Sequence, residues 1–175
     1  YPEVLSEDEF NNKRVFGGRR QYCFNSKTYH KYSEIIIREL ANHYKNEESI
    51  VAWQIDNEFG HEGSDLCYCD LCKKEFNEYL KEKYDNDINK LNETWGTIFW
   101  SQTYNTFEEI PLPKPTITTH NPSLRMEHER FRSESIEKYA KFQVDLLKEI
   151  LGKDSVIIHD FSGGYFDKSY DFSKV

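Results

Sequence analysis

The stretch that decides the fold is a short apolar run, Ile50-Val51-Ala52-Trp53-Gln54-Ile55. A run of this length, led by β-branched residues, is typical of a strand that is buried on both faces of a parallel sheet. A second run of this kind, Ser155-Val156-Ile157-Ile158-His159, lies near the end of the sequence. We therefore predict two strands, at about 50–56 and at about 155–159.

Helices are predicted before and after the first strand. The spacing of apolar residues indicates helices over 28–46, about 70–84 and about 86–94, and a long helix from Pro122 that ends at Gly152. The buried stripe expected for the first helix is Tyr29, Tyr32, Ile36, Leu40 and Tyr44. This order of strand, helices and strand is the pattern of a parallel α/β sheet.

Two parallel strands with unpaired edges do not make a stable sheet or close a barrel. We therefore interpret residues 1–175 as part of a larger α/β domain, and we expect the chain to be marginally stable by itself. Residues 1–27 carry Pro2, Gly17 and Gly18 without a sustained period, which predicts a long loop.

Charge and hydropathy exclude some classes of partner. The formal net charge is -8, which argues against nucleic acid and anionic membrane surfaces, because both are bound by Lys and Arg. The longest aliphatic run, Ile35-Ile36-Ile37, is far shorter than a membrane-spanning helix requires. We expect a cytoplasmic protein; the chain starts at Tyr1 without a Met, so a signal peptide upstream of it is left open.

The four cysteines have a spacing that suits a metal ion. Cys67, Cys69 and Cys72 are clustered, and Cys23 is their distant fourth partner. Four thiolates with this spacing predict a closed, structural zinc site in which all four ligands are cysteines. The alternatives are two disulfides or unrelated buried thiols, and His61 is an alternative fourth ligand.

A carboxylate follows the first strand directly. Asn57 and Glu58 come where a parallel α/β sheet carries its functional residues, at the carboxyl end of a strand. Glycoside hydrolysis needs a carboxylic acid that protonates the leaving oxygen, and an adjacent Asn suits a sugar hydroxyl. The alternative is that either residue only caps the next turn.

Several longer stretches resemble the β-galactosidases of glycoside hydrolase family 42, and the likeness runs in order through nearly the whole chain. The stretches are Trp53-Gln54-Ile55-Asp56-Asn57-Glu58-Phe59-Gly60, the cysteine cluster, Leu91-Asn92-Glu93 with Trp95-Gly96-Thr97 and Phe99-Trp100-Ser101-Gln102, and Arg19-Arg20-Gln21-Tyr22-Cys23 with Asn25-Ser26. The resemblance implies that the chain is the central part of a (β/α)8 TIM barrel that cleaves terminal β-D-galactosyl residues with retention, assembles as a homotrimer and holds zinc through four cysteines.

The resemblance also implies roles for single residues. Glu58 is expected to be the acid/base, kept protonated by a nearby negative nucleophile. Arg20, Asn57 and Trp100 are expected to contact the galactoside, with Trp100 close to a subunit interface.

The sequence departs from the family at two places. The family's nucleophile is a Glu on a later strand, which this chain does not contain, so the chain alone is expected to be inactive. The family usually has Asn after the His of its next strand, whereas this chain has His159-Asp160, and no role is carried over to these two residues. His120 and His128 are predicted to be surface residues.

Two alternative functions stay open at this point. One is another retaining glycosidase of the same fold, such as a β-glucosidase or an α-L-arabinopyranosidase. The other is a zinc-stabilised binding module without catalytic activity.

Overall fold

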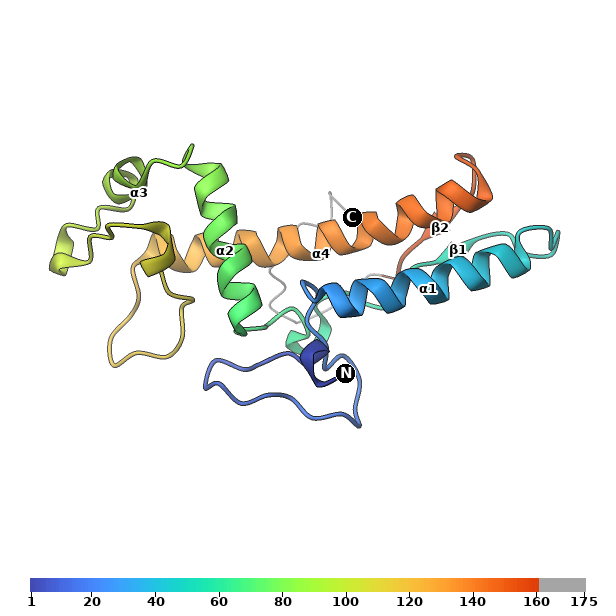
Figure 1. The fold of residues 1–175 in the computed structure, drawn as a ribbon, viewed down its shortest axis with the longest axis horizontal. Coiled ribbons are helices and arrows are strands. Elements are labelled where there is room, and N and C mark those ends of the chain that lie inside the picture. The colour runs from blue at the N-terminus through green and yellow to red at the C-terminus, as the bar shows by residue number, and fades with distance from the viewer. Residues whose placement is uncertain (161–175) are drawn as a thin grey trace.

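One long helix, α4 (Pro122–Leu151), organises the molecule. The first helix, α1 (Lys27–Tyr44), packs along α4, and Figure 1 shows the two side by side. The computed structural model describes residues 1–160, so the last part of the predicted domain lies outside the described residues.

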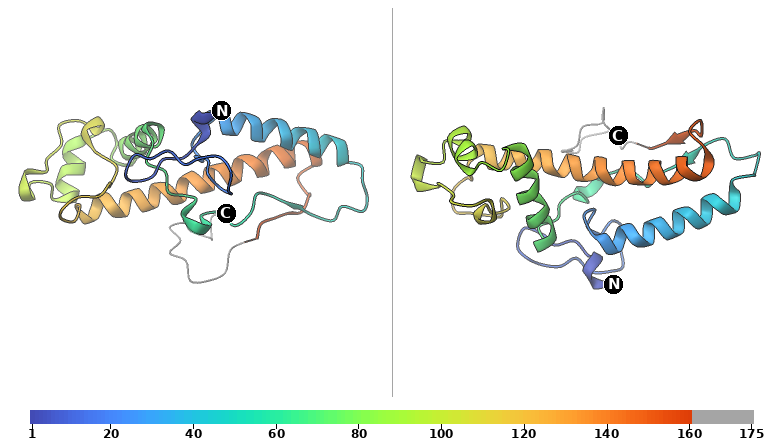
Figure 2. Two further views of the ribbon diagram at one scale, coloured as in Figure 1. Left: turned by 90° about the horizontal axis from the view of Figure 1, so that it is seen from below. Right: turned by 45° about the horizontal axis from the view of Figure 1, so that its top comes forward.

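Two shorter helices pack near the other end of α4. They are α2 (Asp70–Lys83), which crosses α4, and α3 (Ile88–Trp95). Figure 2 shows that α3 and the loops around it form one end of the elongated molecule. The connections contain four short 3-10 turns, Pro2–Val4, His61–Gly63, Phe99–Ser101 and Phe107–Glu109.

The four predicted helices are confirmed, and their observed ends lie within two residues of the predicted ones. Local signals explain these ends. Ser26 accepts a hydrogen bond from the Tyr29 amide at the start of α1, and Asn121 does the same for the Ser123 amide at the start of α4. Gly152, with φ of 97°, ends α4 in a conformation that suits glycine.

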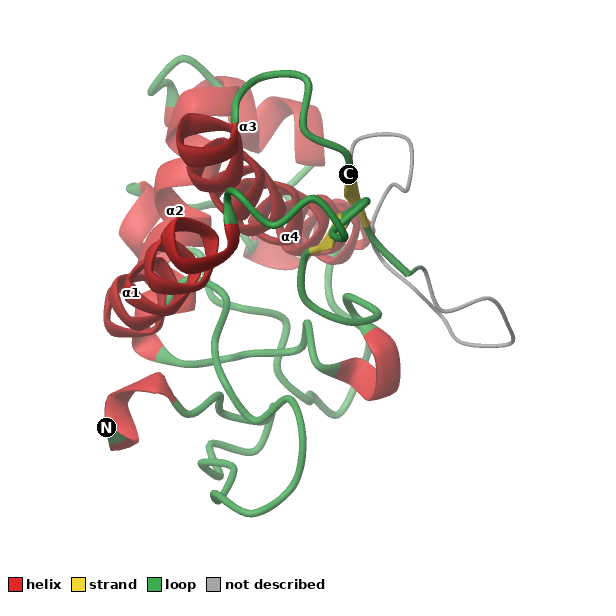
Figure 3. Ribbon diagram, turned by 90° about the vertical axis from the view of Figure 1, so that its right-hand side faces the viewer, coloured by secondary structure: helices red, strands yellow, loops and turns green. Residues whose placement is uncertain are grey.

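The two predicted strands are confirmed as a parallel pair, but they are short. β1 (Trp53–Gln54) pairs with β2 (Ile157–Ile158), with Trp53 opposite Ile157. The prediction that the first strand is buried on both faces is wrong for the described residues, since Ile50 is 37% and Val51 85% exposed. The reason is that α1 and α4 cover one face of the pair, and nothing in residues 1–160 covers the other (Figure 3).

The buried stripe of α1 was also predicted wrongly. Tyr32, Ile36 and Leu40 are at least 39% exposed, as is Tyr44. The face that packs on α4 instead contains Ala41, which is fully buried, and Ser33, whose hydroxyl pairs with that of Tyr139 at 2.8 Å. The helix therefore has two apolar faces, and only one of them is covered within the described residues.

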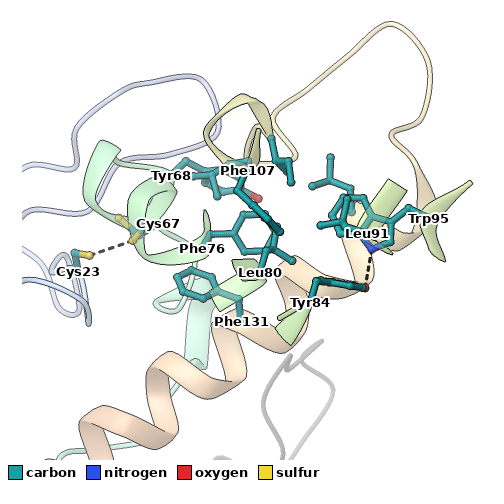
Figure 4. Close-up of a cluster of buried hydrophobic side chains, with 14 residues drawn as sticks. Cys23, Cys67, Tyr68, Phe76, Leu80, Tyr84, Leu91, Trp95, Phe107 and Phe131 are labelled. Atoms are coloured by element: carbon teal, nitrogen blue, oxygen red, sulfur yellow. Dashed lines mark hydrogen bonds between the residues drawn. The ribbon is translucent and has the colours of Figure 1, made fainter. Parts of the chain in front are cut away.

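Two hydrophobic clusters lie along α4. The first cluster surrounds the cysteines and α2, and its centre is made by Phe76, Leu80 and Leu91, each 0% exposed (Figure 4). The second cluster joins α1, the C-terminal half of α4 and the strands, and includes Ile55 and Phe59. Two segments are thus anchored next to each other: the cysteine-bearing segment in the first cluster, and the end of β1 in the second.

The prediction of a surface position for His128 is wrong. His128 is 2% exposed and lies among the rings of Tyr68, Phe76 and Phe131. Its spacing explains this, because His128 follows the buried Leu124 by four residues and precedes the buried Phe131 by three, which is one face of a helix. His120 is half-buried and pairs with the carbonyl of Lys114.

Within residues 1–160, no helix has both the length and the apolar character that crossing a bilayer demands.

Candidate active site and candidate metal centre

Glu58 lies in a tight turn that follows β1. The turn contains two non-glycine residues with left-handed backbones, Asp56 (φ 42°) and Glu58 (φ 44°). The Glu58 carboxylate accepts hydrogen bonds at Oε2 from Arg20 Nη2 (2.9 Å) and from Asn57 Nδ2 (3.2 Å). Three of the four residues that were assigned to the galactoside site, Glu58, Arg20 and Asn57, therefore meet around one oxygen atom.

Arg20 comes to this turn from the N-terminal loop. Arg20 is 8% exposed, and its second guanidinium nitrogen, Nη1, lies 3.5 Å from Glu62 Oε2. Arg20 holds the pKa of Glu58 below its ordinary value, because the guanidinium donates a hydrogen bond to the carboxylate, and this outweighs the opposing effect of burial. Within this chain the carboxylate form of Glu58 is thus favoured. That is the opposite of the protonated state expected of an acid, and a second negative charge would be needed to reverse it.

Asp56, the other carboxylate of the turn, has its pKa moved in the opposite direction. Burial raises the pKa of Asp56, against the hydrogen bond that its Oδ1 accepts from the Asn57 amide (2.7 Å). Its electrostatic neighbours include Tyr22 and Tyr139, which lie in or beside the second hydrophobic cluster. Asp56 therefore lies on the covered side of the strand, where its carboxylate caps the Asn57 amide.

Two residues at the end of β2 also hold this turn, and the sequence alone predicted no role for them. Asp160 Oδ1 accepts from the Glu58 amide (3.3 Å) and from Gln54 Nε2 (2.9 Å). His159 Nδ1 pairs with the Ile55 carbonyl (2.8 Å), and its Nε2 accepts from the Phe59 amide (3.4 Å). The signal that would have found them is their position, since the carboxyl ends of adjacent parallel strands meet at one edge.

The structure does not bring Trp100 to this turn. Trp100 is 67% exposed, has a left-handed backbone (φ 56°) and stacks on Phe99 with ring centroids 4.9 Å apart. The segment 99–101 lies at the end of the molecule beyond α3, remote from β1 (Figures 1 and 2). A role for Trp100 at the Glu58 turn of its own subunit is therefore not supported by the position of the segment.

The four cysteines form one compact cluster. The Sγ atoms of Cys23, Cys67, Cys69 and Cys72 all lie within 4.8 Å of one another, with Cys23 at 3.3 Å from Cys72 and at 4.0 Å from Cys69. Four thiolates around a tetrahedral zinc ion are about 3.8 Å apart, since each Zn–S bond is about 2.3 Å. A disulfide needs sulfurs about 2.05 Å apart, so these distances fit a metal ion and not two disulfides.

Local structure prepares this cluster. Cys69 caps the start of α2, where its Sγ accepts from the Cys72 amide (3.5 Å), and Asn25 Nδ2 donates to Cys72 Sγ (3.4 Å). The pKa of the Cys69 thiol is lowered, foremost because it accepts a hydrogen bond from Cys23. His61 is not a member of the cluster that the described residues form.

The cluster and the Glu58 turn share the N-terminal loop. Arg20 lies three residues before Cys23, and Cys23 donates its amide to the Val4 carbonyl (2.8 Å). The loop that carries Cys23 thus also places Arg20 next to Glu58, as the Arg20–Glu58 ion pair shows.

The chain is similar in sequence and fold to several β-galactosidases. The profile of the glycoside hydrolase family 42, described as beta-galactosidase, matches residues 1–175. The β-galactosidase BgaA of Thermus sp is 41% identical over 95% of this chain, and the β-galactosidase Bga of Halorubrum lacusprofundi is 37% identical over 99% of it. The chain spans about a quarter of the length of these relatives (26% and 25%).

Solved structures agree with the sequence relatives. The crystal structure of a β-galactosidase from Marinomonas ef1 superposes on 99% of the chain with a TM-score of 0.92 at 35% identity, and the chain covers 26% of it. The β-galactosidase from Halorubrum lacusprofundi gives a TM-score of 0.89 over 94% of the chain at 38% identity, with 24% of its own length covered. The chain therefore belongs to glycoside hydrolase family 42, the family of these β-galactosidases.

Proposed function

We propose that the full-length protein is a retaining β-galactosidase and that Glu58 is its acid/base residue. The observation that carries this proposal is the meeting of Glu58, Arg20 and Asn57 at a strand end, in a chain that belongs to this family. Residues 1–175 then form the central part of a (β/α)8 barrel, and β1 and β2 are two of its strands. The uncovered face of the strand pair is where the rest of that barrel would pack.

The proposed reaction is a double displacement. A second carboxylate, a Glu outside this chain, attacks the anomeric carbon, while Glu58 gives its proton to the departing oxygen. Glu58 then takes a proton from water, which attacks the same carbon and releases the second carboxylate and galactose. The negative charge of the second carboxylate raises the pKa of Glu58, and this opposes the effect of Arg20.

Arg20 and Asn57 are proposed to bind the galactoside. Both donate hydrogen bonds to Glu58 in the structure, so each has a polar group at the point where the substrate must meet the acid. Trp100 is proposed to contact the sugar of a neighbouring subunit in a homotrimer. Its support is the exposure of three consecutive apolar side chains, Ile98, Phe99 and Trp100, each at least 66% exposed.

Zinc is the metal that best fits the four thiols. Cys23, Cys67, Cys69 and Cys72 would hold it in a closed site, where it stabilises the fold and takes no part in the reaction. The four free thiols also suit the reducing cytoplasm, which is the location we propose.

The test is replacement of Glu58 in the full-length enzyme. Glu58→Ala is expected to lower turnover of lactose by about 10²–10⁴-fold, the usual contribution of general acid catalysis. Azide is expected to restore part of the turnover of galactosides with activated leaving groups. Glu39→Gln, an exposed change on α1, is the matched control. Unchanged lactose turnover in Glu58→Ala would remove the acid/base assignment. A full-length protein that binds galactosides without hydrolysing them would favour the zinc-stabilised binding module.

A further inference from the structure

The turn that carries Glu58 is a strained segment whose backbone amides need acceptors. Left-handed backbones at Asp56 and Glu58 cost on the order of 1 kcal/mol or more each, because Cβ crowds the carbonyl oxygen. Such a turn persists only where its surroundings fix it. The three successive amides of Asn57, Glu58 and Phe59 donate to side-chain acceptors instead of to a helix or a sheet.

These three acceptors differ in origin. The Asn57 amide is held by Asp56, the residue before it, so this bond is local. The Glu58 and Phe59 amides are held by Asp160 and His159, which lie about a hundred residues later, at the end of β2. The parallel register places the end of β2 beside the end of β1, because Gln54 lies opposite Ile158. The acid/base residue is thus fixed from the neighbouring strand.

Asp160 is itself held in place. Gln54 Nε2 donates to the same Asp160 Oδ1 (2.9 Å) and also lies 3.1 Å from the Asp56 carbonyl. Gln54 therefore links both sides of the turn. This arrangement gives Asp160 a defined position although its side chain is 45% exposed.

We infer that Asp160 is a positioning residue for Glu58. Its Oδ1 accepts a hydrogen bond from the Glu58 amide, and this fixes the turn that holds the Glu58 carboxylate against Arg20 and Asn57. This inference rests on the proposed acid/base role of Glu58. Asp160 acts through the backbone of Glu58 and needs no contact with the substrate. Removing the acceptor frees the amide, the turn relaxes, and the proton donor moves away from the leaving oxygen.

The test separates positioning of the acid from general damage by means of the leaving group. In the full-length enzyme, kcat/KM is measured for an alkyl galactoside, whose leaving oxygen needs a proton, and for a dinitrophenyl galactoside, which leaves without one. Asp160→Ala is expected to lower kcat/KM for the alkyl galactoside by about 10²-fold, as misplacement of a catalytic group by about 1 Å can do. The kcat/KM for the dinitrophenyl galactoside is expected to change by less than about 3-fold, since general acid catalysis contributes little to the departure of that leaving group.

Asp160→Asn is the conservative variant, because the amide keeps an oxygen acceptor at the same place. It is expected to restore most of the alkyl galactoside activity that Asp160→Ala removes. Asp154→Ala, an exposed change in the loop before β2, is the control for a lost carboxylate elsewhere. The inference is overturned if Asp160→Ala lowers kcat/KM equally for both galactosides, or if it lowers kcat/KM for neither.

A second variant decides the case if Asp160→Ala does not fold. Gln54→Leu removes the hydrogen bond that holds Asp160, and it is expected to lower kcat/KM selectively for the alkyl galactoside, by about 10-fold, a smaller displacement than full loss of the acceptor. No selective loss in that variant also overturns the inference. Glu58→Gln is measured in parallel. If the loss of kcat/KM in Glu58→Gln does not depend on the leaving group, the proposed function fails. If that loss depends on the leaving group in Glu58→Gln but not in the Asp160 and Gln54 variants, only the positioning role fails.

Discussion

The two hydrophobic clusters along α4 differ in how completely this chain builds them. The cluster around the cysteines draws its side chains from residues 23–131, and its central residues are fully buried. The cluster beneath the strands is also buried, but the neighbouring apolar residues Val51, Ile158 and Ile36 lie outside it and are 85%, 47% and 55% exposed. The candidate metal centre is therefore a local structure that the chain can complete, whereas the proposed catalytic centre would need further surfaces and a second carboxylate.

The largest expected effect is at the cysteine cluster. Cys72→Ser removes one of four thiolates from a buried site, and we expect a loss of more than about 4 kcal/mol in the free energy of unfolding, together with loss of bound zinc. Circular dichroism and the zinc content of the purified protein measure both. Lys73→Ser, an exposed change at the next position of α2, should affect neither. Full zinc content and unchanged stability in Cys72→Ser would show that the stability of the cysteine cluster does not depend on a metal bound by Cys72.

The next effect is a loss of stability in acid. It is expected at His128, which lies among the rings of the first hydrophobic cluster. Burial lowers the pKa of His128 to about 3, and Arg132 adds to this shift. The ordinary pKa of His is about 6.5, so the unfolded chain takes up the proton first, and stability is lost as the pH falls from about 6.5 towards about 3. His128→Phe should reduce this loss, because Phe cannot be protonated. Unfolding in urea at a series of pH values measures the difference, and parallel curves for both proteins would contradict it.

A smaller effect is expected at Arg20, which connects the cysteine-bearing loop to the Glu58 turn. Arg20→Ala should raise the pKa of Glu58 towards its ordinary value, because the main cause of its lowering is removed. The pairing stabilises the fold above the ordinary Glu pKa of about 4.3, and this stabilisation is lost as the pH falls through the lowered pKa. Carboxyl NMR titration measures the shift. Arg19→Ala, the exposed neighbour, is the control, and an equal shift in both variants would remove the role of the ion pair.

The smallest effect tests the uncovered face of α1. In this chain Ile36→Lys should change the free energy of unfolding by no more than about 0.5 kcal/mol, because the side chain is already 55% exposed. In the full-length protein the same change should cost more than about 1 kcal/mol, since burying a charge against a neighbouring helix is unfavourable. Thermal unfolding of both proteins is the measurement. Equal and small effects in both would mean that no other part of the barrel covers this face.

Much of the fold follows from local signals. Ser26, Asn121 and Gly152 mark helix ends by hydrogen bonding and backbone freedom, which act within a few residues and are readable in sequence. The face of α1 that is buried is a different matter. Tyr32 and Ile36 have the same apolar character as the residues that do pack, and only the position of α4 decides between the two faces.

The candidate site divides in the same way. Residue types and their spacing placed Glu58 after a strand and predicted a metal site at the four cysteines. The resemblance to family 42 gave Glu58 its expected acid/base role and Arg20 its expected contact with the substrate. Only the folded chain reveals that Arg20 lowers the pKa of Glu58 and that Asp160 and His159 hold the backbone of the turn. It also reveals that the segment 99–101 lies remote from this turn. The physical reason is that residue type and spacing fix what a side chain can do, while the pairing of β1 with β2 fixes which distant side chains it meets.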